Sequence, residues 1–154
     1  MKPFLALTSL VAVMLAQAPP NPNAPAIVPR PAGAQIKVPA GFSVDEYAAG
    51  FARPRFMVEG PGGEVLVTDT VAKGSVFALR NGTKKALISG LDRPYGLALW
   101  RDYLYVGEPE SLKRYKYDSK TLVAGPGQEV VSMAGFSKGH VTRTILFDER
   151  AGKM

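Results

Sequence analysis

A repeat of about 40 residues restricts the fold of this chain more than any other feature. Arg53-Pro54 recurs as Arg93-Pro94, and the acid that ends the following apolar run recurs from Asp69 to Glu108. Repeats of about 40 residues, each built from four short strands, are typical of β-propeller blades. A third copy starts at residues 142–147 and has its turn at 148–152. The spacing therefore predicts an all-β, partial β-propeller with about two blades plus the start of a third.

The local pattern from residue 35 onward agrees with this fold class. Short β-branched and aromatic runs alternate with glycine, proline and asparagine clusters, which is typical of antiparallel strands. Asn81-Gly82 predicts a tight hairpin turn between strands at 75–80 and 84–89. Asn81-Gly82-Thr83 is also a glycosylation sequon, although the turn explains it without a sugar. The second unit predicts strands at 95–99, 103–106, 112–117 and 129–133, the last of them after a Gly-Pro-Gly loop at 125–127.

The N-terminus has the pattern of a secretory signal. Lys2 precedes an apolar run at 4–15 and the small residues Ala16-Gln17-Ala18. This run is shorter than the roughly 20 residues that span a bilayer as a helix, so we expect a signal peptide at 1–18 and no stable membrane span. Cleavage after Ala26 is a second option, and an uncleaved anchor is the alternative. Residues 19–34 are rich in proline and alanine and predict a linker. We expect a folded part at 35–154, in a periplasmic or secreted protein.

Composition narrows the possible partners. The chain has 46% hydrophobic and 21% charged residues, so a packed core is expected. There is no cysteine, which excludes disulfides and thiolate metal sites. The net charge of +6 is dispersed, and its densest stretch, 113–117, fits an exposed strand as well as a binding patch. We therefore expect no nucleic-acid partner.

His140 is the only histidine and the candidate catalytic residue. An imidazole titrates near neutral pH and can act as a general base. It directly precedes the predicted first strand of the third unit, in a small loop with Lys138 and Gly139. Strand alternation places Thr142 and Thr144 on one face and Arg143 and Ile145 on the other, so His140 and Arg143 need not point the same way. The simpler alternative is a surface loop histidine.

Three segments resemble the opening of the glucose/sorbosone dehydrogenase family of soluble, exported quinoproteins: residues 36–44, 91–98 and, most specifically, 139–145. The resemblance covers about 35–154 and implies a six-bladed propeller with pyrroloquinoline quinone (PQQ) over the channel and calcium beside it. It implies that His140 takes a proton from a sugar hydroxyl or aldehyde hydrate while hydride moves to the quinone.

The resemblance also limits what this chain can do alone. Cofactor and calcium ligands come mostly from later blades of that family, so none is assigned to residues of this chain. We expect an N-terminal fragment of a sugar oxidoreductase that needs an electron acceptor and is inactive by itself. The alternatives are a non-enzymatic binding propeller, and a metal-dependent lactone hydrolase for which Asp69 and Glu108 are the strand-end carboxylates.

Overall fold

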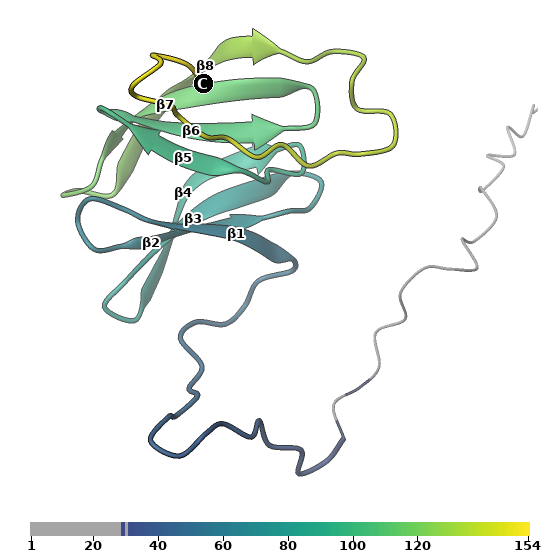
Figure 1. Ribbon diagram of the computed structural model, residues 1–154, viewed down its shortest axis with the longest axis vertical. Coiled ribbons are helices and arrows are strands. Elements are labelled where there is room, and N and C mark those ends of the chain that lie inside the picture. Colours follow the sequence, from purple (N-terminus) through teal and green to yellow (C-terminus); the bar gives the residue numbers. More distant parts are fainter. Residues whose placement is uncertain (1–28, 30) are drawn as a thin grey trace, which may run out of the picture. The chain divides into compact units, whose positions relative to one another are not determined.

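The described residues, 29 and 31–154 of the computed structural model, form two four-stranded antiparallel sheets and no helix (Figure 1). Each sheet is a meander in which consecutive strands pair, with the orders β1-β2-β3-β4 and β5-β6-β7-β8. The strands are β1 Pro54–Glu59, β2 Val65–Asp69, β3 Gly74–Arg80, β4 Thr83–Leu91, β5 Leu97–Trp100, β6 Tyr103–Glu108, β7 Ser111–Asp118 and β8 Val123–Ser132. The two predicted repeat units thus correspond to the two sheets.

The turn between β3 and β4 confirms the predicted hairpin. Asn81 and Gly82 have φ angles of 50° and 72°, and Arg80 pairs with Thr83 across them. Two consecutive positive φ values suit the right-handed twist of the flanking strands, and asparagine and glycine tolerate them best. The turn conformation accounts for this dipeptide.

The predicted loop at 125–127 is wrong, because these residues lie inside β8. β8 is the outermost strand of its sheet, where a proline such as Pro126 removes no hydrogen bond to a further strand. A Cβ on Gly127 would lie 2.7 Å from the ring of Tyr115 on β7, so glycine makes room for that aromatic side chain. The pairing of β7 with β8 shifts register between Tyr115 and Tyr117, which accommodates the Gly-Pro-Gly sequence within the strand.

The core lies between the two sheets. Its buried side chains include Leu66 and Val76 from the first sheet and Leu104 and Val106 from the second, each 0% exposed. Phe56 and Tyr95 extend this contact, with ring centroids 5.8 Å apart. Face-to-face burial of this kind is what neighbouring propeller blades offer each other.

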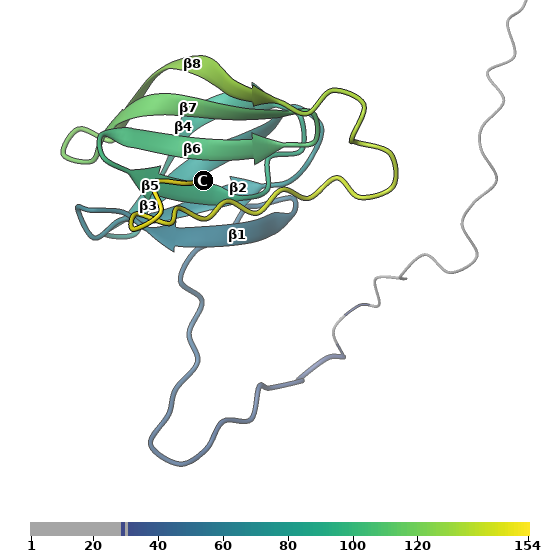
Figure 2. The same cartoon turned by 45° about the horizontal axis from the view of Figure 1, so that its top comes forward.

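The segment after β8 is extended and lies along β5 (Figure 2). The odd-numbered residues from Val141 to Phe147 are half-buried and the even-numbered ones are exposed, as in a strand with one covered face. Phe147 stacks on Trp100 at 5.1 Å between ring centroids. The segment therefore covers part of the second sheet with one face. The strand predicted at 142–147 is not formed, because among the described residues one backbone hydrogen bond, from Gly96 to Arg143, joins residues 142–147 to the second sheet.

The described residues up to Val44 belong to a separate N-terminal unit and form no strand. The predicted signal segment and most of the predicted linker lie outside the described residues. Over the residues that are described, no helix has the length and apolarity needed to cross a membrane.

Candidate functional site

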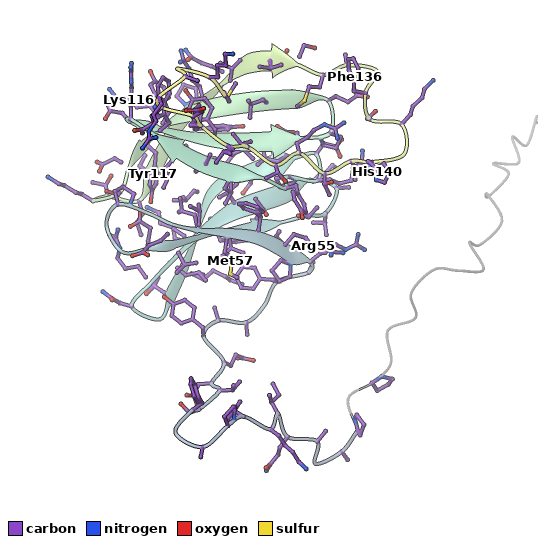
Figure 3. All side chains as sticks on the ribbon, in the orientation of Figure 1. Arg55, Met57, Lys116, Tyr117, Phe136 and His140 are labelled. Carbon is purple, nitrogen blue, oxygen red and sulfur yellow. The ribbon has the colours of Figure 1, made fainter. Side chains whose placement is uncertain are left out.

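The candidate site is the end of the two sheets at which His140 lies. β2 and β6 finish at this end with Asp69 and Glu108, and the connection from β4 to β5 passes through it. In Figure 3, His140 and Arg55 lie at this end, and Lys116 and Tyr117 lie at the opposite one. The connection between the two sheets and the segment after β8 both lie here, and binding and catalytic residues are found disproportionately on such connecting segments.

The carboxylates of Asp69 and Glu108, at the ends of β2 and β6, accept hydrogen bonds from backbone N–H groups at this end of the sheets. The Asp69 carboxylate accepts hydrogen bonds from the backbone N–H groups of Ala52, at 3.0 Å, and Arg53, at 2.5 Å. Glu108 accepts one from the backbone N–H of Asp92 at 2.9 Å and forms an ion pair with Lys113 at 2.8 Å. Both acids thus fix the chain that enters the first strand of their own sheet. This use of the carboxylates speaks against the lactone hydrolase alternative, which needs them as metal ligands.

The connection between the sheets carries an exposed ion pair. Arg93 donates to Asp92 through Nε at 2.9 Å and through Nη2 at 3.1 Å. The hydrogen bonds from Arg93 hold the pKa of Asp92 below its ordinary value. Arg93 has a φ of 44°, in the left-handed region that residues other than glycine seldom adopt. Its backbone N–H donates to the carbonyl of Val71 at 3.0 Å, which holds this conformation in place.

His140 is exposed. Its backbone carbonyl accepts a hydrogen bond from Arg143 Nη1 at 3.0 Å. Among the described residues, no hydrogen bond or ion pair involves the imidazole. Thr142 and Thr144 are exposed, and Arg143 and Ile145 are half-buried, which confirms the predicted alternation. An exposed imidazole with no partner in the described part of the chain is free to act as a hydrogen-bond donor or acceptor.

The loop that carries His140 has anchors that sequence reasoning missed. Ser137 Oγ donates to the Glu110 carboxylate at 2.6 Å, and the N–H of Met133 donates to the Glu110 carbonyl at 2.7 Å. On the other side, Arg143 Nη2 donates to the carbonyl of Phe136 at 2.7 Å. Glu110 gave no signal in the sequence, whereas Arg143 stands inside the motif of the resemblance and could have been singled out.

A calcium ion is not accommodated by the described residues alone. Calcium takes 6–8 oxygen ligands, commonly with several carboxylates among them. Within residues 29 and 31–154, no three acidic or histidine side chains are grouped as metal ligands would be, and Asp69 and Glu108 are already engaged. Two basic side chains at this end are engaged as well, Arg93 with Asp92 and Arg143 with loop carbonyls. These residues do not form a complete site for calcium or for a quinone.

No family model and no curated protein matches the sequence. Among solved structures, the holo form of the PQQ domain of pyranose dehydrogenase from Coprinopsis cinerea is similar, with 21% identity and a TM-score of 0.62 over 75% of this chain. The calcium and iodide structures of a Trichoderma reesei protein of carbohydrate-active enzyme family AA12 are 26% identical, with a TM-score of 0.56 over 68% of this chain. The chain spans 30% and 29% of those chains. The two sheets therefore have the fold of part of a PQQ sugar dehydrogenase-like domain.

Proposed function

We propose that this chain is the N-terminal part of an exported, PQQ-dependent oxidoreductase that oxidises a sugar or sugar aldehyde, with His140 as its general base. The observation that carries the proposal is the position of His140, which is exposed and lies between β8 and the extended segment that follows it. The similarity to the PQQ domain of a pyranose dehydrogenase supports the sugar substrate.

The role of His140 follows from its chemistry. A neutral imidazole accepts the proton of a sugar hydroxyl as the carbon beside it loses hydride, and general bases of this kind contribute about 10²–10⁴-fold to rate. The hydride needs an acceptor, which is the chemistry that bound PQQ supplies. The described residues provide the base and no complete cofactor site, so we propose that the 154-residue chain alone is inactive.

The experiment uses the longest reading frame that contains this sequence. The protein is loaded with PQQ and calcium, and sugar-dependent reduction of a dye is measured. We expect His140→Ala to lower kcat about 10²–10⁴-fold. Lys138→Ala, two residues away in the same loop, is the matched control and should keep the parent activity. The 154-residue chain under the same conditions should reduce no dye.

Two results would contradict the proposal in different ways. Parent-like activity of His140→Ala removes the role of His140 and leaves the reaction class standing. A stably folded protein that reduces no dye with any sugar, and whose quinone absorbance does not change on titration, removes the reaction class. That second result favours the non-enzymatic binding propeller.

A further inference from the structure

The loop before His140 is fixed by polar contacts at both of its ends. At its start, Met133 and Ser137 bond to Glu110 in the turn between β6 and β7. At its end, the single side chain of Arg143 reaches back over the loop. Loops without such contacts move on the nanosecond to microsecond timescale, so the contacts decide how well His140 is placed.

Arg143 donates to three backbone carbonyls. Nη1 bonds to the carbonyls of His140 at 3.0 Å and Thr142 at 2.8 Å, and Nη2 bonds to that of Phe136 at 2.7 Å. A guanidinium is planar and presents its donors in a rigid fork, so three acceptors bound to it are held at fixed relative positions. Hydrogen bonds from a charged donor are also stronger than neutral ones. The guanidinium thus joins the middle of the loop to the residue that precedes the extended segment.

The backbone of Arg143 is itself anchored on the second sheet. The N–H of Gly96 donates to the Arg143 carbonyl at 3.0 Å. A Cβ on Gly96 would overlap that carbonyl oxygen, and one on Gly107 would lie 2.7 Å from it. Two glycines therefore form a seat in which the Arg143 backbone lies directly against backbone. The side chain that holds the His140 loop starts from this rigid point.

We infer that Arg143 is a positioning residue for His140. It transmits the fixed geometry of the second sheet to the loop through three carbonyl contacts. This inference rests on the proposed function for its catalytic meaning, because a positioned base matters only if His140 is the base. Its structural content, an ordered loop that depends on Arg143, can be tested without any turnover.

The test is NMR spectroscopy of the 154-residue chain, whose only histidine gives one set of imidazole signals. Backbone order parameters for residues 136–140, together with relaxation dispersion for the slower motions that order parameters do not report, are measured in the wild type, Arg143→Gln, Arg143→Lys and the control Arg150→Gln. Rigid backbone gives order parameters near 0.85 and flexible backbone gives values below about 0.6. We expect a fall from the first range towards the second in Arg143→Gln, a smaller fall in Arg143→Lys, and no change in the control.

The outcomes separate the inference from the proposed function. Unchanged order parameters and an unchanged imidazole shift in Arg143→Gln overturn the positioning role, whatever His140 does. Loss of loop order together with full activity of His140→Ala in the longer protein supports the positioning of the loop and overturns the catalytic proposal. Arg143→Lys keeps the charge and the aliphatic stem. Lower order parameters for residues 136–140 in that variant therefore support the inference even where Arg143→Gln destabilises the sheet. Signals of the β2 and β6 amides report in each variant that the sheets are intact.

Discussion

The joint between the two sheets at the end opposite His140 offers the sharpest test of the structure. Glu64, which is 0% exposed, accepts a hydrogen bond from Tyr117 Oη on β7 at 2.6 Å and forms an ion pair with Arg80 on β3 at 2.5 Å. Arg80 also donates to the carbonyl of Ser119 at 2.7 Å. One buried carboxylate therefore joins β3 of the first sheet to β7 of the second. We expect Tyr117→Phe and Glu64→Gln to destabilise the fold by different amounts.

The magnitudes follow from what each substitution leaves behind. Tyr117→Phe removes one hydrogen bond to an ionised group, which is worth about 1.5–3 kcal/mol. Glu64→Gln leaves Arg80 without its charged partner, and removing one member of a buried ion pair costs about 3–5 kcal/mol. The side chain of Arg80 is 24% exposed, so water replaces part of the lost contact and the lower end of that range is expected. In the Glu64→Gln background, Tyr117→Phe should cost only about 0.5–1.5 kcal/mol, because the remaining bond is neutral.

The same site predicts that the free energy of unfolding falls at acidic pH, a decrease called the acid limb below. Burial raises the pKa of Glu64, but hydrogen bonds from Tyr117, from its own backbone and from Arg80 together outweigh it and lower the pKa below 4.5. A carboxylate with a lowered pKa in the folded state contributes stability above its unfolded pKa. This contribution is lost as the pH falls from 4.5 through the folded value. In Glu64→Gln that part of the acid limb should be absent.

Urea unfolding, followed by circular dichroism from about pH 3 to 7, measures all of these effects. Tyr103→Phe is the control, because the ring of Tyr103 packs on Tyr105 and Arg114 and its hydroxyl makes no hydrogen bond among the described residues. An unchanged slope of free energy against urea shows that the variants unfold from comparable states. A Tyr117→Phe variant within about 0.5 kcal/mol of the wild type, or an acid limb that survives in Glu64→Gln, would refute the buried joint.

Two further predictions concern the second sheet. Gly96→Ala should destabilise the docking of the extended segment by about 1–3 kcal/mol, since its methyl group overlaps the Arg143 carbonyl. The fluorescence of Trp100, the only tryptophan, reports on this docking because Phe147 stacks on its ring. Gly125→Ala is the control, since a Cβ there makes only ordinary contacts. A Gly96→Ala variant with the same emission and urea midpoint as Gly125→Ala would contradict the close contact at Gly96. Burial, aided by the charge of Glu108, raises the pKa of Tyr115 from 10 to about 12, so its share of stability is present below pH 10 and lost as the pH rises towards 12. The urea midpoint of Tyr115→Phe should depend less on pH between about 9 and 12, and a profile parallel to the wild type would show that the tyrosine is not the titrating group.

The sheets could be predicted from the chain because their signals are local. Asn81-Gly82 specifies its own turn, and the repeat from Arg53-Pro54 to Arg93-Pro94 marks equivalent strand entries. The prediction for β8 was wrong because Gly-Pro-Gly normally interrupts a strand, and only its position at the sheet edge makes it acceptable.

The joint at Glu64 could not be predicted in the same way. Glu64 and Tyr117 are 53 residues apart, and no local pattern links two positions that meet only after both sheets have formed. At the candidate site, the sequence singled out His140 and the alternation that follows it. The anchoring by Glu110 and Arg143 depends on where the turn between β6 and β7 lies in space, and that requires the folded sheet.

The seat formed by Gly96 and Gly107 also bears on how this site could be re-engineered. Because the contact with Arg143 is made by backbone atoms and Phe147 packs on Trp100, the position of the arriving segment does not depend on its exposed side chains. The exposed positions 142, 144 and 146 can therefore be varied in a library while the backbone that presents His140 stays in register. Such a library would change the exposed surface beside His140 one residue at a time, with the two glycines and Arg143 kept constant.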